Sequence, residues 1–277
     1  MKTNLMNRIA ACSVVALGLI ATASAEPASP RSGAYKIEET RLAPWDGNEK
    51  APLNAALSRD GRHLAYVIRR DAKVCVVADG QRGAEYDGIL SISFSFNGKR
   101  IGYAAKKGQK WFIVVDGQPG AEYDFVDGPV FSPDAKRIAF AAKKGEKWSA
   151  VVDSLPGMEY DYVVFPIFSS DSKRVLYVAL KGKLGLVVVD GQPGPDYDVI
   201  FMPEFSPDGK HVAYVAKRGE KLLVVVDGQS GVEYDGLNIG APSFVRKGDP
   251  HFRPDDVLEY LAARDNSLYR LKYIPVP

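Results

Sequence analysis

The sequence predicts an all-β fold: a six-bladed β-propeller whose four-stranded antiparallel blades repeat every 37 residues. The first observation is a repeated segment, which reads VVDGQPGAEYD at residues 114–124 and recurs in altered form four more times. The second is that turn residues interrupt short apolar, β-branched and aromatic runs about every 8 to 12 residues. The corner aspartates of the repeated segment follow one another at steps of 37 residues: Asp79, Asp116, Asp153, Asp190 and Asp227. Repeats of about 40 residues with four strands each are typical of propellers.

Each unit is predicted to contain four strands, as residues 129–164 illustrate. The first three strands are PVFS, RIAFAA and WSAVVD, and SPDAK and KKGEK are the turns between them. The corner SLPG then leads into MEYDYVV, residues 158–164, as the fourth and outermost strand. Because side chains alternate between the two faces of a strand, the tyrosine of this motif is expected to face the neighbouring blade while its acidic neighbours face solvent.

The ring is predicted to close through the N-terminal segment. Residues 252–273 match the second and third strands of the other units after a ten-residue insertion, and this sixth unit ends after its third strand. The candidate for the missing strand is AYKIEETRL, residues 34–42, within a segment of residues 26–52 that precedes the repeats of residues 53–277. A strand donated in this way removes the last free sheet edge. An open array with a frayed end is the alternative.

The first 25 residues are predicted to be a cleaved signal peptide. MKTNLMNR carries two positive charges, IAACSVVALGLIATA is apolar, and the small residues ATASA place the cut after Ala25. We therefore expect a periplasmic or secreted protein without a membrane span, because crossing a bilayer takes ~20 apolar residues. Without Lys2 and Arg8 the chain holds 34 basic and 34 acidic residues, so its charge gives no reason to expect nucleic acid as a partner.

Two segments carry a resemblance to a known family. FSPDAKRIAFAAKKGEKW and FSPDGKHVAYVAKRGEKL resemble the Ser-Pro-Asp-Gly propeller repeats of the TolB-like superfamily, which are similar to WD-repeats but lack the Trp-Asp pair. The resemblance covers residues 53–271 and implies a propeller, but it says little about the ligand. The N-terminal α/β domain of TolB is not expected here. Neither is the hydrolase domain that follows similar propellers in prolyl-oligopeptidase-type enzymes, since no Gly-x-Ser-x-Gly motif occurs.

A basic column is predicted in the turns between second and third strands. In a propeller these turns share one end of the molecule with the linkers between blades, so the cations would form a rim there. The column consists of Arg70, Lys107, Lys144, Lys181, Arg218 and Arg264, and a second tier of Lys73, Lys110, Lys147 and Lys221. Such a rim suits an acidic partner, either a protein surface or an anionic glycan or lipid head group. The alternative is that these are ordinary soluble turn residues, offset by Glu146 and Glu220.

Two departures from the repeat are further candidates for a binding site. Glu204 stands on an innermost strand, where the other units carry alanine, serine, valine or isoleucine, so its carboxylate is expected at the central channel. The ten-residue insertion VRKGDPHFRP is a polar loop without a duty in the repeat. Loops of this kind on a rigid scaffold often carry recognition residues. Its candidates are Arg246, Lys247, Asp249, His251 and Arg253.

The sequence predicts no catalytic site, no metal site and no cofactor. His63 and His211 share a repeat position with three arginines, which indicates a surface basic site and not a metal ligand set. The turn acids, such as Asp134, come one per unit, so capping of the turns explains them better than calcium binding. Cys75 aligns with apolar residues in the other units and is expected to be buried.

These observations favour an exported, monomeric, non-catalytic binding or scaffold module. The expected partner is a protein, bound at the basic turns or at the channel mouth. Two alternatives stay open, because one scaffold hosts many unrelated sites. The first is a small propeller enzyme, similar to a lactonase or a glycan hydrolase, that uses the central channel. The second is a structural repeat protein that assembles with itself, against which the charged outer strands argue.

Overall fold

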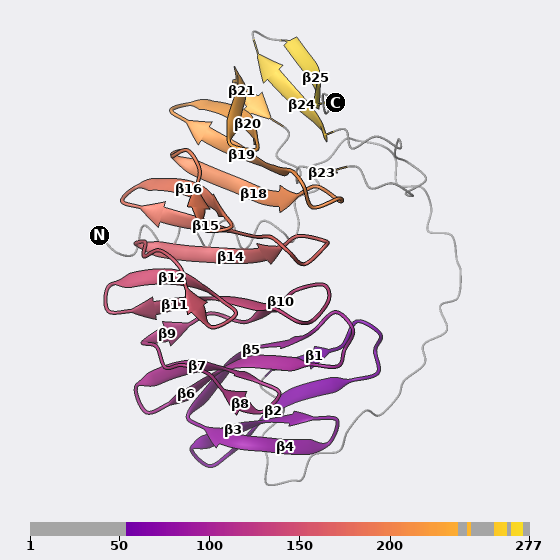
Figure 1. Cartoon of the computed structure of the whole chain (residues 1–277), viewed down its shortest axis with the longest axis vertical. Coiled ribbons are helices and arrows are strands. Elements are labelled where there is room, and N and C mark those ends of the chain that lie inside the picture. Colours follow the sequence, from indigo (N-terminus) through magenta and orange to yellow (C-terminus); the bar gives the residue numbers. More distant parts are fainter. Residues whose placement is uncertain (1–53, 238–242, 245–257, 265–266, 274–277) are drawn as a thin grey trace, which may run out of the picture. The chain divides into compact units, whose positions relative to one another are not determined.

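The computed structural model describes residues 54–237, 243–244, 258–264 and 267–273, all within the unit Ala43–Pro277. In this part of the chain every regular element is a strand, so no helix there could cross a bilayer. The strands form six antiparallel sheets, which follow one another in chain order (Figure 1). The predicted all-β fold of four-stranded antiparallel sheets is confirmed.

The first three sheets have strands with the following bounds. Sheet 1 contains β1 (Ala55–Leu57), β2 (Leu64–Arg70), β3 (Lys73–Ala78) and β4 (Gln81–Tyr86). Sheet 2 contains β5 (Gly88–Phe94), β6 (Ile101–Lys107), β7 (Lys110–Val115) and β8 (Gln118–Pro119). Sheet 3 contains β9 (Phe125–Val126), β10 (Val130–Phe131), β11 (Ile138–Lys144), β12 (Lys147–Val152) and β13 (Leu155–Pro156). β9 and β10 both pair with β11 and together take the place of one first strand.

The other three sheets repeat this order. Sheet 4 contains β14 (Tyr162–Phe168), β15 (Val175–Lys181), β16 (Leu184–Val189) and β17 (Gln192–Pro193). Sheet 5 contains β18 (Val199–Phe205), β19 (Val212–Arg218), β20 (Lys221–Val226) and β21 (Gln229–Tyr234). Sheet 6 contains β22 (Gly236–Leu237), β23 (Ser243–Phe244), β24 (Leu258–Arg264) and β25 (Ser267–Tyr273). The second strands of sheets 1 to 5 begin at steps of 37 residues, so the repeat read from the sequence is the structural repeat.

Sheet 6 has the predicted second and third strands, but none of its described strands occupies the fourth position. β22 and β23 pair with one edge of β24, and β25 pairs with the other. β25 is therefore the outermost strand of this sheet among the described residues. The candidate closing strand, residues 34–42, lies outside the described residues, and no closed ring is seen in them.

The predicted fourth strand holds in sheets 1 and 5, where β4 and β21 end at the motif tyrosines Tyr86 and Tyr234, but its bounds are wrong in sheet 3. In sheet 3 the strand is the short β13, which pairs with β12 through Leu155 and Pro156 and belongs to the predicted corner SLPG. Tyr160 makes an isolated bridge to Trp148, and the connection ends at Asp161. Residues 162–164, assigned to the same strand from the sequence, instead begin β14 of the next sheet. An apolar run cannot show which of two neighbouring sheets it joins, because both pairings bury it equally well.

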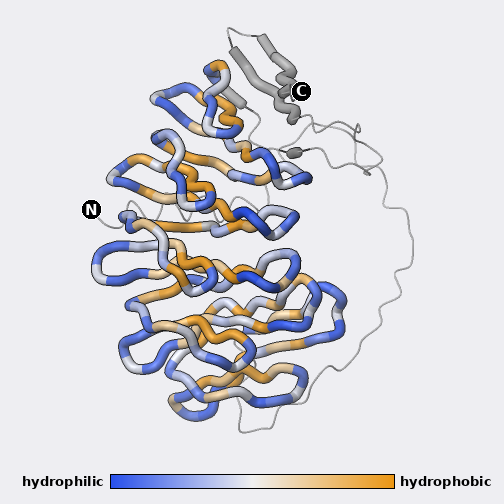
Figure 2. The backbone as a smooth tube through the Cα atoms, viewed as in Figure 1, coloured by the Kyte–Doolittle hydropathy of each residue, from blue (hydrophilic) through white to orange (hydrophobic). Residues whose placement is uncertain are grey.

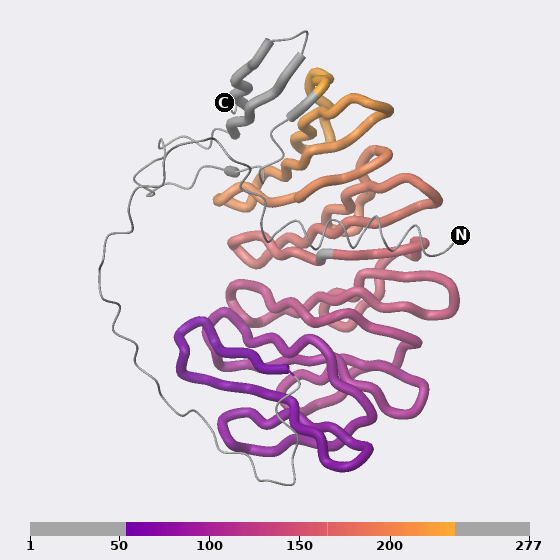
Figure 3. The backbone as a smooth tube through the Cα atoms, turned by 180° about the vertical axis from the view of Figure 1, so that it is seen from behind, coloured from indigo at the N-terminus to yellow at the C-terminus, as the bar shows by residue number. Residues whose placement is uncertain are grey.

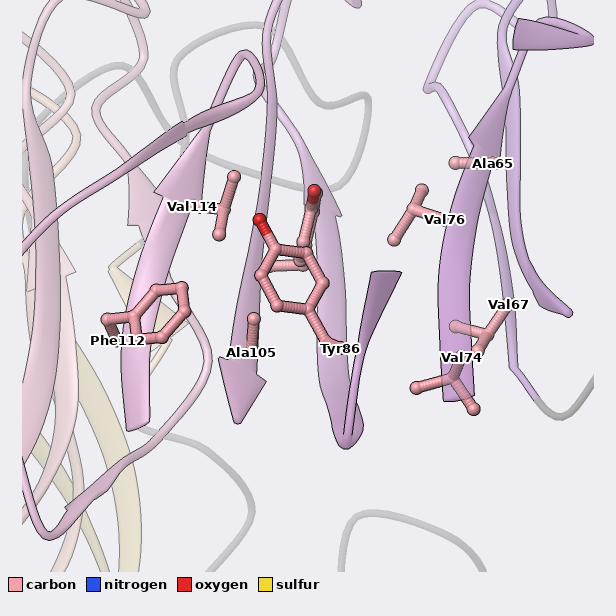
Figure 4. Packing of buried hydrophobic residues seen from close by; sticks show 9 residues of the cluster. Ala65, Val67, Val74, Val76, Tyr86, Ala105, Phe112 and Val114 are labelled. Atoms are coloured by element: carbon pink, nitrogen blue, oxygen red, sulfur yellow. The ribbon is translucent and has the colours of Figure 1, made fainter. Parts of the chain in front are cut away.

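The core lies between consecutive sheets. Apolar residues concentrate along the strands and polar residues at the turns (Figure 2), and the same order of sheets is seen from behind (Figure 3). Between sheets 1 and 2, Tyr86 lies between Val76 on one side and Ala105 and Phe112 on the other (Figure 4). Its ring meets that of Phe112 edge-on, with centroids 5.7 Å apart. The tyrosine of the repeated motif therefore faces the neighbouring sheet as predicted.

Candidate binding face

The two ends of the sheets carry different turns. One end of each sheet holds the turn between the second and third strands and the connection to the next sheet, and we call it the hairpin end. The other end holds the turn between the first and second strands and the corner between the third and fourth strands, and we call it the corner end. The connection and the next hairpin are joined directly, because the backbone N–H of Gly108 donates to Oδ2 of Asp87 at 2.7 Å. The predicted basic column lies at this hairpin end, beside the links between sheets.

Each connection holds an aspartate that ties two sheets together. Asp87 accepts a hydrogen bond from Nζ of Lys73 at 2.5 Å, within its own sheet, as well as the bond from Gly108 of the next sheet. The bond from Lys73, followed by that from Gly108, holds the pKa of the Asp87 carboxyl below its usual value. The same arrangement joins Asp124 to Lys110 and Gly145, and Asp161 to Lys147 and Gly182, while Lys221 pairs with Asp235. The second-tier lysines are therefore ion-pair partners inside the chain.

Sheet 4 departs from this arrangement. Leu184, 37% exposed, stands where the other sheets have lysine. Among the described residues, the carboxylate of Asp198 then accepts only the backbone N–H of Gly219, at 2.7 Å. The fold tolerates the missing ion pair, as expected for an exposed pair worth ~0–1 kcal/mol.

The residues of the basic column differ in what they contact. Lys107, Lys144 and Lys181 are exposed, and none of them forms an ion pair with any described residue. Arg218 pairs with Glu233 at 3.6 Å and lies over the ring of Tyr197. Arg70 also takes part in an interaction. Arg264 ends β24, opposite Ser267. Three lysines in consecutive sheets thus have no ion-pair partner among the described residues.

At the corner end, a serine and an aspartate organise each turn. In sheet 3, Oγ of Ser132 donates to Oδ1 of Asp134 at 2.6 Å and accepts the backbone N–H of Arg137 at 2.9 Å. Oδ1 of Asp134 also accepts the backbone N–H of Lys136, at 3.1 Å. The other turns use Ser58 with Asp60, Ser95 with Asn97, Ser169 with Asp171 and Ser206 with Asp208. The predicted turn-capping role of these acids is confirmed.

The basic residues of the corner end join neighbouring sheets. Nε of Arg137 lies 2.8 Å from Oδ2 of Asp153 in its own sheet. Its Nη1 donates to the backbone oxygens of Ser172, at 3.2 Å, and Lys173, at 2.6 Å, in the next sheet. Arg100 and Arg174 repeat this contact, and His63 and His211 pair only with Asp79 and Asp227. The residues of the expected surface basic site are therefore already engaged within the chain, since each arginine and histidine among them pairs with an aspartate.

These aspartates predict that the protein loses stability in acid. The Ser206 hydroxyl, followed by the Lys210 backbone N–H, lowers the pKa of Asp208 to about 2. A carboxyl with a lowered folded-state pKa stabilises fully above its unfolded pKa of about 4, and this contribution is lost as the pH falls through about 2. We expect the free energy of unfolding, measured in urea, to fall over this range. Asp208→Asn should fold, because Asn97 caps the equivalent turn, and should show a smaller fall. An unchanged fall would contradict a role for this carboxyl.

The two departures from the repeat are placed as follows. Glu204 lies on β18 opposite Ala213, directly after a bulge that separates it from Phe201. It is half-buried and takes part in an interaction. Residues 246–253, which include the five loop candidates, lie outside the described residues.

One cavity lies between two sheets of the described residues. A cavity of about 200 Å³ at the corner end, between sheets 4 and 5, is lined mainly by Val187, Val189 and Val212. The two charged groups at this cavity are already paired, Arg174 with Asp190 and Asp227 with His211. Cys75 is buried at 7% exposure, as expected from its apolar alignment. The cavity therefore brings together no unpaired acid and base.

An aromatic row at the hairpin end was missed in the sequence. It consists of Trp111, Phe125, Trp148 and Tyr162, which alternate between third and first strands across sheets 2, 3 and 4. Successive ring centroids lie 5.4, 5.8 and 4.8 Å apart, and all four side chains are half-buried. Two repeat positions could have revealed it: Val74, Trp111, Trp148, Gly185 and Leu222, and Gly88, Phe125, Tyr162, Val199 and Gly236. Rings occur there only in the middle of the chain.

The chain is similar to solved β-propellers at low identity. TolB from Acinetobacter baumannii is 19% identical, with a TM-score of 0.38, over 65% of this chain and 53% of that one. The β-propeller domain of the Trilobed protease from Pyrococcus furiosus is 12% identical, with a TM-score of 0.38, over 82% of this chain and 81% of that one. The Dos1 propeller is 8% identical, with a TM-score of 0.42, over 80% and 69%. No family model and no curated protein matches the chain. This chain thus spans about half of the TolB chain, and the TolB-like repeat stays a resemblance.

Proposed function

We propose that this chain is an exported, non-catalytic β-propeller that binds a protein partner through the hairpin end of its blades. The observation that carries the proposal is the set of unpaired lysines, Lys107, Lys144 and Lys181. Lys110 and Lys147, beside Lys107 and Lys144, are held by aspartates of the connections, whereas the three unpaired lysines have no comparable role among the described residues. Exposed cations in three consecutive blades favour an acidic partner surface.

We further propose that the propeller has six blades and is closed by residues 34–42. Support comes from β25, the outermost strand of sheet 6 among the described residues, while sheet 1 already has four strands of its own. A strand added beside β25 would complete the sixth blade. Closure predicts lysine cross-links between Lys36 and Lys272 within one molecule. A cross-linking map in which Lys272 links elsewhere and never to Lys36 would contradict it.

A capture experiment tests the proposed function. The full chain, with a C-terminal affinity tag, is recovered from the exported fraction. Its intact mass should match a chain whose first residue is Glu26. The hairpin variant changes Lys107, Lys144 and Lys181 to glutamate. The control changes Lys99, Lys136 and Lys173 to glutamate, which alters the net charge equally at exposed positions of the corner end. Proteins retained by each folded bait are then identified by mass spectrometry.

We expect the wild type and the control to retain the same protein and the hairpin variant to lose it, by about tenfold or more. Retention by all three baits would contradict the proposed face. If no protein is retained, while the wild type binds anionic vesicles or an anionic polysaccharide and the hairpin variant does not, then the partner is a lipid or a glycan. Recovery of the unprocessed chain from the cytoplasm would contradict export.

A further inference from the structure

We infer that the aromatic row and the three unpaired lysines form one docking strip for an extended acidic protein segment that carries aromatic or large apolar side chains. The inference rests on the proposed function and names the chemistry of the partner. Its components are Trp111, Phe125, Trp148 and Tyr162 with Lys107, Lys144 and Lys181.

The repeat does not need these rings. At the repeat position of Trp111 and Trp148, sheet 1 has Val74 and sheet 4 has Gly185. These two sheets pack on their neighbours without an aromatic residue at that position. The position of Phe125 is Gly88 in sheet 2. The aromatic row thus spans sheets 2, 3 and 4, the same three sheets that carry the unpaired lysines. If the rings served packing alone, they would be expected between every pair of neighbouring sheets, since all sheets have the same backbone arrangement. They would not be expected only in the three sheets that carry the unpaired lysines.

The rings lie next to the hairpins that carry the lysines. Trp111 pairs with Lys106 on the neighbouring strand, one step from the pair of Lys107 and Lys110 that ends the hairpin, and Trp148 stands in the same relation to Lys143 and to the pair of Lys144 and Lys147. Nζ of Lys106 lies 5.9 Å from the centroid of the Trp111 ring. Gly88 of the first strand lies beside that ring, since a Cβ at this position would be in ordinary contact with its edge at 3.7 Å. A partner that lies across the hairpin end therefore meets the hairpin lysines and, one residue along the strands, the half-buried rings.

Charge and geometry favour a peptide over a sugar. The rings meet one another at 54°, 61° and 63°, so each ring face is partly covered by the edge of the next. A sugar stacks on an open, flat ring face, whereas an aromatic or apolar side chain also packs between tilted rings. An extended chain advances about 3.3 Å per residue, so three centroid steps of 4.8–5.8 Å correspond to about five residues. Carboxylates flanking the apolar side chains would meet the lysines.

Two labelled peptides test the inference on the full chain. One alternates glutamate with phenylalanine, and the matched peptide alternates glutamate with alanine, so that both carry the same charge. Binding is followed by fluorescence polarisation and, independently, by the emission of the tryptophans. We expect the phenylalanine peptide to bind about tenfold more tightly than the alanine peptide. Trp148→Val should remove that difference, while Lys144→Glu should weaken the binding of both peptides.

The outcomes separate this inference from the proposed function. Equal binding of both peptides to the wild type, lost in the lysine variant, would overturn the role of the rings and leave the basic face intact. No binding of either peptide would overturn the acidic-segment inference, while the capture experiment decides the proposed function separately. If Trp148→Val fails to fold, the comparison of the two peptides on the wild type still decides. Trp148→Phe, which keeps a ring, should retain most of the difference.

Discussion

Replacing Arg137 with alanine is expected to destabilise the protein by about 2 kcal/mol. The change removes the ion pair with Asp153, two hydrogen bonds to the next sheet and the packing of the guanidinium over Phe168, 5.2 Å from its centroid. The ion pair contributes little by itself, because its side chains are 30% and 40% exposed. The larger loss comes from the backbone oxygens of Ser172 and Lys173, which lose a charged donor. The midpoint of urea unfolding should fall accordingly.

Two matched variants isolate the link between sheets. Lys136→Ala removes an exposed neighbouring cation and should leave stability within about 0.5 kcal/mol of the wild type. Arg137→His introduces the residue that sheets 1 and 5 carry as His63 and His211, which keep the pair to aspartate. The histidine side chain is too short to donate to the next sheet, so the free energy of unfolding of this variant should lie between those of the wild type and the alanine variant. If the histidine variant were as stable as the wild type, the hydrogen bonds between sheets would contribute nothing.

Replacing Gly128 with alanine is expected to cost about 1–3 kcal/mol, because it overpacks the innermost strands. A Cβ at Gly128 would lie 2.3 Å from the Cβ of Ser91, which occupies the same repeat position one sheet earlier. The Cβ of a serine cannot turn away, so the backbone must move. Ser91 itself has a φ of 50° within the bulge of β5, a conformation that glycine adopts more easily.

The double variant Gly128→Ala with Ser91→Gly tests this reason for the loss. Removing the serine side chain relieves the clash and suits the positive φ, so the pair should recover most of the stability that Gly128→Ala loses. Ser91→Gly alone should change the free energy of unfolding by less than about 1 kcal/mol. Additive losses in the double variant would show that the two positions do not touch, since only neighbouring residues couple strongly.

Much of the fold could be predicted from the sequence because its signals are local. The turn residues and the alternation of apolar side chains lie within a few positions of one another, and the strand starts of β2, β6 and β11 follow the predicted step of 37 residues. The fourth strand of sheet 3 was extended too far, because local signals do not show where one sheet ends. Tyr162 follows Asp161 without a turn residue between them, and only its pairing with β15 shows that it belongs to the next sheet.

The candidate site was predictable in position but not in detail. The repeat placed Lys107 and Lys110 at the same turn, yet only one of them is held by an aspartate. The aromatic row was missed because its members come from different sheets, and each looks like an ordinary strand residue by itself. The rings meet only when the sheets pack together.

By itself, the sequence determined the strand content, the period of 37 residues and the positions of the basic column, because these depend on turn chemistry and on side-chain alternation over a few residues. The tertiary structure alone decided which of the described cations are neutralised within the chain and which are not. Lys110 and Asp124 lie 14 residues apart, and Arg137 reaches a backbone oxygen 36 residues away. Contacts at such separations form only when neighbouring strands and sheets are in place, and no local pattern records them.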